Sequence, residues 1–142
     1  MKKIFIDTDV ILDTLLDRKP HVISSAKLLN LVSTRAIIGF TSTLALANIY
    51  YVHRKVSEND ITISYLKFLM NLMNILSVDK KNIEMALNCK NFKDFEDAIQ
   101  HFCARENDME FIITRNVSDY RYSNIPVLTP MQFLNSYHCE GV

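Results

Sequence analysis

The chain has 142 residues, a length that favours one domain covering residues 1–142. Hydrophobic residues make up 49% of it and charged residues 23%, which is the balance of a globular protein and not of a disordered chain. Its 16 Lys and Arg residues equal its 16 Asp and Glu residues, so a strongly basic binder of polyanions is excluded. The two glycines are too few for a glycine-rich phosphate-binding loop.

The N-terminal apolar run, residues 4–6, ends at Asp7 and is too short for a signal peptide or a membrane span. We therefore expect a cytoplasmic protein that makes no membrane contact. The cysteines are Cys89, Cys103 and Cys139, an odd number without a Cys-x-x-Cys pair. In a cytoplasmic protein, this pattern favours inert thiols over disulfides or a zinc site.

Short apolar runs alternate with segments of helical periodicity along the whole chain. Strands are predicted at residues 3–6, 36–40, 75–78, 111–114 and 125–128, and helices at 10–16, 20–34, 43–53, 59–73, 79–88, 94–103 and from 130 onward. Pro126 cannot donate a ladder hydrogen bond, so the last strand is expected at an edge. The alternation predicts an α/β fold, with a central parallel sheet of about four to five short strands and helices on both faces.

Polar and acidic residues follow the predicted strands, where the carboxyl ends of parallel strands form ligand sites. They are Asp7 and Asp9 after the first strand, Thr41 and Ser42 after the second, and Asn116 and Asp119 after the fourth, with Asp94, Glu96 and Asp97 at the start of a helix. Carboxylates gathered at one place repel one another unless a divalent cation neutralises them. Oxygen ligands favour Mg²⁺ or Mn²⁺ over zinc.

Each acid also has a purely structural interpretation. Asp7 is suited to cap the following helix, Asp94 and Asp97 resemble a capping pair, and Asp119 and Asn116 are common turn formers. Helical periodicity alone places Asp97 on the solvent face. Asp13, Asp17, Asp60 and Asp108 are assigned to the surface or to caps, and His21, His53, His101 and His138 to surface or partly packed positions.

Three segments together resemble the PIN-domain family, small α/β metal-dependent ribonucleases that include the VapC-type toxins of bacterial toxin–antitoxin pairs. They are Ile4-Phe5-Ile6-Asp7-Thr8-Asp9-Val10-Ile11-Leu12-Asp13, Asp94-Phe95-Glu96-Asp97-Ala98 and Ile113-Thr114-Arg115-Asn116-Val117-Ser118-Asp119-Tyr120. The resemblance implies a PIN-like fold and an Mg²⁺- or Mn²⁺-dependent endoribonuclease that cleaves single-stranded RNA. It also implies a cognate antitoxin protein as partner, with Asp7, Asp97 and Asp119 as the metal-binding and catalytic carboxylates.

The chain departs from the family pattern at the position of Asn48, where relatives commonly have Glu. The family also often has Asn where Asp9 stands. Losing a carboxylate weakens a metal site, although the Asn carbonyl can still ligate and Asp9 or Glu96 can restore the charge. Restoring the acid with Asn48→Glu is therefore expected to tighten metal binding.

Further residues are expected to support RNA binding and dimer formation. Thr8, Thr41 and Ser42 are candidates to bind a phosphate or a metal-bound water, and Arg115, with Asn116, to bind the RNA. Two helices carry Tyr50, Tyr51, Met70 and Met73, more apolar surface than a small domain buries, which favours a homodimer.

Two other functions remain open. One is a catalytically weak PIN domain that binds RNA or a protein without cutting. The other is a haloacid-dehalogenase-type phosphatase, because Asp7-Thr8-Asp9 resembles the first motif of that family.

Overall fold

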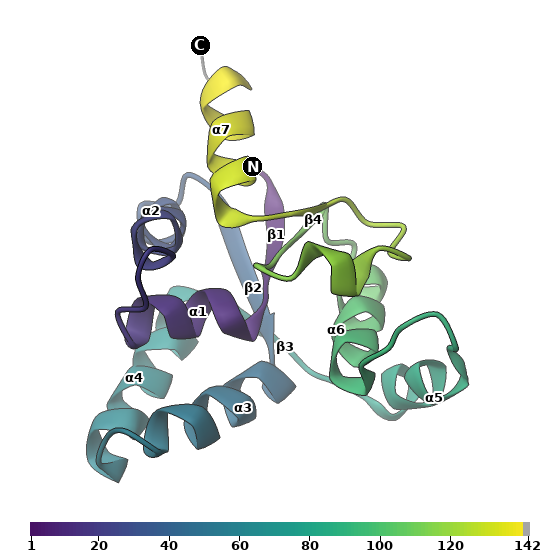
Figure 1. The fold of residues 1–142 in the computed structure, drawn as a ribbon, viewed down its shortest axis with the longest axis horizontal. Coiled ribbons are helices and arrows are strands. Elements are labelled where there is room, and N and C mark those ends of the chain that lie inside the picture. The colour runs from purple at the N-terminus through teal and green to yellow at the C-terminus, as the bar shows by residue number, and fades with distance from the viewer. Residues whose placement is uncertain (141–142) are drawn as a thin grey trace.

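The computed structural model describes residues 1–140, with side chains through His138, so the thiol of Cys139 lies outside the described part. Five parallel strands form one sheet in the order β3-β2-β1-β4-β5 (Figure 1). They are β1 (Lys3–Ile6), β2 (Ile38–Ser42), β3 (Asn74–Leu76), β4 (Phe111–Ile113) and β5 (Val127–Leu128). The predicted α/β fold with a central parallel sheet is confirmed, and β5 lies at an edge as Pro126 indicated.

Helices cover both faces of this sheet (Figure 1). They are α1 (Thr8–Leu15), α2 (Val22–Ser33), α3 (Thr43–Arg54), α4 (Asn59–Leu72), α5 (Lys80–Asn88), α6 (Phe95–Glu106) and α7 (Pro130–Glu140), with the 3-10 helix η1 (Val117–Tyr120) after β4. In Figure 1, α1 to α4 lie to the left of the strands and α5 and α6 to the right. Among the described helices, none is both long and apolar enough to cross a bilayer.

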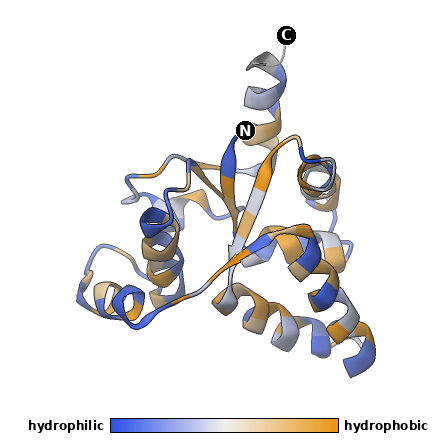
Figure 2. Ribbon diagram, turned by 180° about the vertical axis from the view of Figure 1, so that it is seen from behind, coloured by the Kyte–Doolittle hydropathy of each residue, from blue (hydrophilic) through white to orange (hydrophobic). Residues whose placement is uncertain are grey.

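The central strand β1 is buried from both sides. Ile4 and Ile6 belong to the larger core cluster, formed with α1, α2 and α4, whereas Phe5 packs with Ala104 of α6 and Ile112 of β4. This alternation follows from the pleat, which points successive side chains to opposite faces. Figure 2 shows the result: the strands and the inward sides of the helices are mostly hydrophobic. The carboxyl end of β1 is therefore held rigidly between its two neighbours.

Several element boundaries differ from the sequence prediction, and those of β2 and α2 show the physical reasons most clearly. β2 begins at Ile38 and not at residue 36, because its pairing with β1 starts where Ile38 meets Lys3. It extends to Ser42, which is also the N-cap of α3. The helix predicted from residue 20 begins at Val22, after a turn in which its N–H donates to the carbonyl of Arg18.

Several burial predictions were wrong. Asp13 is fully buried and not at the surface, and the side chains of His53 and His101 are buried as well. Met73, expected to add exposed apolar surface, is only 5% exposed, so it belongs to the core. Cys103 is buried, and burial raises the pKa of its thiol to about 11, which keeps it protonated at neutral pH.

Candidate metal centre

An open pocket of about 420 Å³ lies at the carboxyl edge of the sheet. It forms there because β1 leads directly into α1, while α6 brings its first turn and α3 its middle turns to the same edge. Its polar lining consists of Asp7, Thr8, Asp9, Asn48, Glu96, Asp97 and Asn116, and Arg18 and Tyr51 stand beside them. Seven residues proposed from the sequence thus come from four separate segments to line one pocket.

Asp7 is the most deeply buried of these acids, at 8% exposure. It caps α1, since its Oδ1 accepts the backbone N–H of Thr8 at 2.7 Å, and Gln100 Nε2 donates to the same oxygen at 3.4 Å. The hydroxyls of Thr114 and Tyr120 donate to Oδ2 at 3.0 and 3.2 Å. Burial raises the pKa of Asp7 although these hydrogen bonds lower it. The cap therefore accounts for only part of what surrounds this carboxylate.

Asp9, in the first turn of α1, has one carboxylate oxygen that is hydrogen-bonded and one that is not. Its Oδ2 accepts from the backbone N–H of Arg115 and the amide of Asn116, at 3.2 and 3.1 Å, and lies 3.3 Å from the hydroxyl of Thr114, whose single proton is shared with Asp7. Its Oδ1 is buried and has no hydrogen-bond partner. Burial first, and the charge of Asp7 second, raise the pKa of Asp9 to about 7. A buried unpartnered carboxylate oxygen is costly in isolation, and a bound cation would satisfy it.

Asp97 lies in the first turn of α6, whose N-cap Asp94 accepts the Asp97 N–H at 3.0 Å. The expected capping pair is thus present, but the Asp97 side chain is half-buried and not on the solvent face. Helical side chains lean toward the N-terminus, which brings a first-turn residue into the pocket. Burial, followed by the charges of Asp7, Asp94 and Asp119, raises the pKa of Asp97 to about 7.

The hydroxyl of Tyr120 lies between the two central acids, 3.2 Å from Asp7 Oδ2 and 3.4 Å from Asp97 Oδ1. Burial and the charges of Asp7 and Asp97 raise the phenol pKa well above its usual value, so the ring stays neutral. A phenol has one proton and can donate it to only one carboxylate. Without a cation, the pair is best satisfied when one carboxyl group is protonated, in agreement with the raised pKa values.

At the rim of the pocket, Asn48 of α3 donates its side-chain N–H to Glu96 Oε2 of α6 at 3.0 Å. The residue that replaces the family's acid thus orients a carboxylate that comes from a different helix. Glu96 is exposed, so its second oxygen can face the pocket.

Asp119 lies in η1 and is exposed, and it does not line this pocket. Its charge still acts on Asp97, so the two residues are not on opposite sides of the molecule. Among residues 1–138, no group of three or more Asp, Glu, His or Cys side chains is arranged to hold one ion. Two central carboxylates, Asp7 and Asp97, suit Mg²⁺, which commonly takes one or two protein carboxylates and completes its shell with water and substrate phosphate.

The two hydroxyls at the end of β2 are not available to a substrate, contrary to prediction. Thr41 and Ser42 are both fully buried. Thr41 donates to the carbonyl of Ile6 at 2.9 Å, and Ser42 caps α3 and donates to the Oε1 of Gln100. Both side chains are used inside the fold because β2 continues two residues farther than its apolar run indicated.

Arg115, predicted to bind the RNA backbone, is engaged within the protein. Its Nη2 donates to Asp13 Oδ1 at 3.1 Å, and its Nε lies 2.6 Å from Asp13 Oδ2. Arg18 approaches the same carboxylate at 3.7 Å. A buried charge needs such a partner, so the pairing explains how Asp13 can be fully buried and fixes the loop that follows β4.

The sequence prediction assigned no role to three residues that contact the acids: Thr114, Tyr120 and Gln100. Thr114 and Tyr120 belong to the segment that carries the PIN resemblance, but their contacts with Asp7 span more than a hundred residues. Gln100 is 3% exposed within the apolar stripe of α6. A glutamine at a position where periodicity demands a core residue is the signal that could have identified it.

The parallel sheet with a carboxylate-lined pocket at its carboxyl edge places the chain among α/β proteins whose site lies at the ends of the strands. Residues 3–118 match the family model for the PIN domain, and the chain belongs to that family. This excludes the haloacid-dehalogenase interpretation of the first motif.

Two kinds of relatives agree with this assignment. Ribonuclease VapC1 of Aquifex aeolicus (strain VF5) is 27% identical over 141 residues, or 96% of each chain. A solved VapBC2 complex from Rickettsia felis, bound to a promoter DNA fragment, superposes with a TM-score of 0.68 at 15% identity, covering 87% of this chain and 96% of that one. VapC20 of Mycobacterium tuberculosis, a toxin that cleaves the sarcin-ricin loop, superposes with a TM-score of 0.62 at 13% identity, covering 77% and 86%. At these identities the solved structures establish the shared fold.

Proposed function

We propose that this protein is a metal-dependent endoribonuclease that cleaves single-stranded RNA, and the toxin of a toxin–antitoxin pair that acts in the cytoplasm. The observation that carries the proposal is the pair of acids on either side of the Tyr120 hydroxyl, the buried Asp7 and the half-buried Asp97, in a chain of the PIN family. Burial raises the pKa values of both carboxyl groups, and the charge of Asp7 raises that of Asp97 further, a pattern typical of functional sites. The relative named Ribonuclease VapC1, alike over nearly its whole length, supports the same activity.

Asp7 and Asp97 are the proposed ligands of Mg²⁺ or Mn²⁺, with Asp9 and Asp119 in support. The orphaned Oδ1 of Asp9 and the mutual repulsion of the acids fit a divalent cation. When bound, such an ion polarises the scissile phosphate and lowers the pKa of a water nucleophile. The protein's own contribution is to hold the carboxylates ionised and oriented: Thr114, Gln100 and Tyr120 donate hydrogen bonds to Asp7 from three different elements.

An unpaired RNA strand suits this pocket better than a duplex. The two central acids lie within a recess and not on a flat surface. Unstacked nucleotides can bend so that a phosphate enters a recess, whereas the backbone of a duplex is stiff. Because the net charge is zero, RNA binding must depend on a few local cations and decrease with salt.

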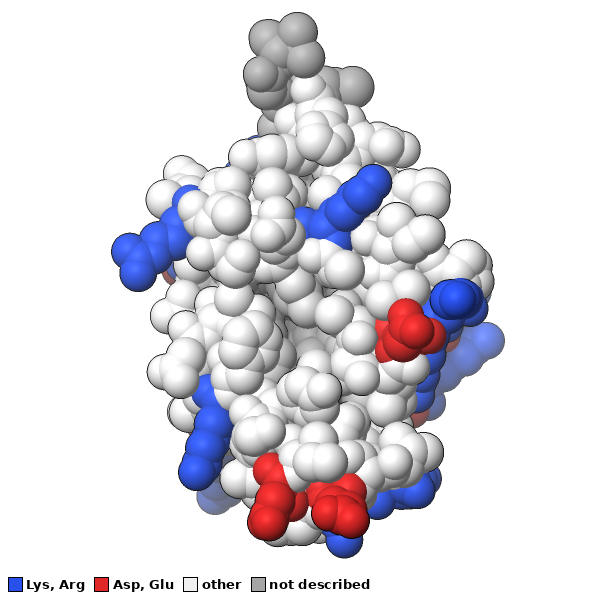
Figure 3. Space-filling view, turned by 90° about the vertical axis from the view of Figure 1, so that its left-hand side faces the viewer, with Lys and Arg blue, Asp and Glu red and all other residues white. Residues whose placement is uncertain are grey.

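An antitoxin partner is proposed from the relatives, since the Rickettsia structure is a VapBC complex. We also propose a homodimer through α4. Along this helix Ile61, Tyr65 and Phe68 are 47%, 37% and 55% exposed and recur at helical spacing, so they form one apolar stripe. Met70 is also 56% exposed, but helical geometry places it on the other side of α4. Figure 3 shows the side of the molecule that carries α2 and α4, where the centre is largely free of charged side chains. Such uncharged surface is typical of protein interfaces.

Tyr51, grouped from the sequence with the residues of a dimer interface, lines the acidic pocket instead. At 69% exposure, it is placed to contact RNA at the mouth of the site. The dimer proposal therefore depends on α4 and not on the tyrosine pair of α3. Light scattering of the wild type and of Phe68→Asp tests it: a wild type that is monomeric at high concentration contradicts the proposal.

The nuclease test incubates a defined single-stranded RNA with the wild type and Asp7→Asn, with Mn²⁺ or with chelator. Cleavage by the wild type only in the presence of metal is expected, and its loss in Asp7→Asn excludes a contaminating nuclease. Asp97→Asn should lose as much as Asp7→Asn, because residues that act through one site are not additive.

Asn48 leaves open a second function, a PIN domain that binds RNA or a protein without cutting it. Mn²⁺ separates the two possibilities independently of activity, because a ligand that binds only the folded state raises the melting temperature. A wild type that Mn²⁺ does not stabilise, and that leaves RNA intact, favours the binding function.

A further inference from the structure

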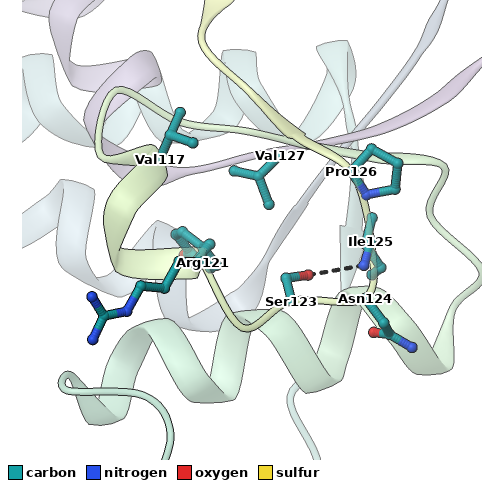
Figure 4. A pocket seen from close by; sticks show the side chains of 8 residues that line it. Val117, Arg121, Ser123, Asn124, Ile125, Pro126 and Val127 are labelled. Atoms are coloured by element: carbon teal, nitrogen blue, oxygen red, sulfur yellow. Dashed lines mark hydrogen bonds between the residues drawn. The ribbon is translucent and has the colours of Figure 1, made fainter.

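A second hollow, of about 410 Å³, lies between η1, the following loop and β5 (Figure 4). Its walls include the apolar side chains of Val117, Ile125 and Val127. Arg121 stands at one end and Asn124 at the other (Figure 4). An apolar wall with polar groups at both ends suits a flat, amphipathic ligand such as a nucleobase.

Tyr120 connects the hollow to the two central acids of the acidic pocket. Tyr120 borders the hollow, and its hydroxyl contacts both Asp7 and Asp97. An RNA strand whose phosphate lies at these carboxylates therefore has its next nucleotide close to the hollow. The position of the hollow relative to the acids suits a substrate that continues past the site of cleavage.

Arg121 supplies the cation that this path needs. Its side chain is exposed, and its guanidinium lies 4.9 Å from the ring centre of Tyr122, which is itself 54% exposed. It forms no ion pair with any of the described residues, whereas Arg115 is neutralised by the buried Asp13. A guanidinium held over an aromatic ring and free of acidic partners can bind a phosphate or stack on a base.

Asn124 supplies an unused hydrogen-bonding group. Its side-chain amide is exposed and makes no hydrogen bond within the described part of the chain. Ser123, by contrast, accepts the N–H of Ile125 at 3.0 Å and lies 2.9 Å from His101 Nδ1, so its hydroxyl is already used. Only Asn124 is therefore free to meet the edge of a base at that end of the hollow.

We propose that Arg121, Tyr122 and Asn124 form, with this hollow, a binding subsite for the unpaired RNA nucleotide that adjoins the scissile phosphate. Arg121 binds the backbone phosphate, the apolar wall holds the base, and Asn124 contacts its edge. The inference rests on the proposed ribonuclease function and extends it, because it assigns substrate binding to residues outside the acidic pocket.

RNA binding is measured by fluorescence anisotropy with a labelled single-stranded oligonucleotide, in the Asp7→Asn background so that the RNA stays intact. Arg121→Gln is expected to weaken binding about tenfold and to reduce the slope of log K against log salt by about 0.7, the loss of one phosphate contact. Asn124→Ala should weaken binding about threefold without changing that slope, since the group is neutral. The matched control is Lys27→Gln, an exposed cation on α2 that should change neither quantity.

Two further measurements separate the possible failures. Tyr122→Phe should retain the affinity that Tyr122→Ala loses, because the phenyl ring still supports the guanidinium. The melting temperature and its increase with Mn²⁺ should be unchanged in Arg121→Gln, since the side chain is exposed and lies outside the acidic pocket. If the wild type cleaves RNA but Arg121→Gln binds as tightly as Lys27→Gln, the subsite is refuted and the nuclease stands. If the wild type neither binds nor cleaves RNA, the proposed function fails and the subsite with it.

Discussion

Replacing Asp7 with Asn tests the electrostatic coupling of the two central acids in the metal-free protein. Asn is itself a good N-cap, so α1 should begin where it does now. Its carbonyl can accept the hydrogen bonds that Thr8 and Gln100 now donate to Oδ1, and its amide can donate to the hydroxyls of Thr114 and Tyr120. The substitution therefore removes a negative charge and leaves the shape of the site in place.

The strength of the repulsion between Asp7 and Asp97 follows from the Tyr120 hydroxyl, which both carboxylates contact. Because Asp7 and Asp97 oxygens lie 3.2 and 3.4 Å from the same Tyr120 atom, the two charges are about 6 Å apart, and their repulsion is about 0.7 to 3 kcal/mol for effective dielectric constants between about 80 and 20. This corresponds to about half to two pKa units. Burial is the largest cause of the raised pKa of Asp97, so we expect a fall of about one unit.

The assay is a carbon-13 NMR titration of the Asp97 carboxyl group without metal. The pKa of Asp97, now about 7, should decrease to about 6 in Asp7→Asn. Asp119→Asn should lower it less, because the charge of Asp119 contributes less than that of Asp7. An Asp97 pKa that is unchanged in Asp7→Asn, or that responds more to Asp119→Asn, would refute the coupling.

Three further outcomes can be measured. Folding raises the pKa values of Asp9 and Asp97 from 3.8 to about 7, so between these values the folded metal-free protein holds protons that the unfolded chain has lost. Thermal unfolding should therefore show greater stability at pH 5 than at pH 8. Equal stability at the two pH values would contradict the raised pKa values. Tyr120→Phe removes a hydrogen-bond donor, so it should raise the pKa of Asp97 and lower the free energy of unfolding, measured by urea denaturation, by about 1 kcal/mol. A stabilised variant would contradict the donor role of the Tyr120 hydroxyl. Asn48→Glu is expected from the sequence to tighten metal binding, but it would place a second carboxylate where Asn48 now donates to Glu96. Calorimetry should therefore show no gain in Mn²⁺ affinity in Asn48→Glu unless Glu96→Gln is added. A gain in the single variant would refute the repulsion between the two acids.

The fold was predictable because its signals are local. Most of the buried strands are short apolar runs, and several of the connecting helices begin at a capping residue such as Ser42 or Asp79. Strand ends were less certain, since β2 continues through Thr41 and Ser42, whose polarity resembles that of a loop. Pairing with β1 and β3 decides that boundary, and pairing is not visible in the residues themselves.

The pocket was only partly predictable. Asp7 and Asp97 could be proposed because each follows a strand or begins a helix, where the geometry of a parallel sheet brings ligands together. The pairing of Arg115 with Asp13 could not be predicted, because charged residues are ordinarily assigned to the surface. Gln100 and Tyr120 were missed for a related reason: what they do depends on a partner far away in the chain.

The central position of β1 has a consequence for how the protein is made. β1 is the first strand to be synthesised, but on one of its sides it stays unpaired until β4 has been made. Asp7, at the end of β1, also needs the hydrogen bond from Tyr120, so the site requires nearly the whole chain. Contacts of such long sequence separation form late in folding. A chain still being translated, with β4 and η1 not yet released, has Asp7 and Asp97 but not the arrangement that holds them. A truncated product would lack the site for the same reason, so the proposed activity would arise only once synthesis is almost finished.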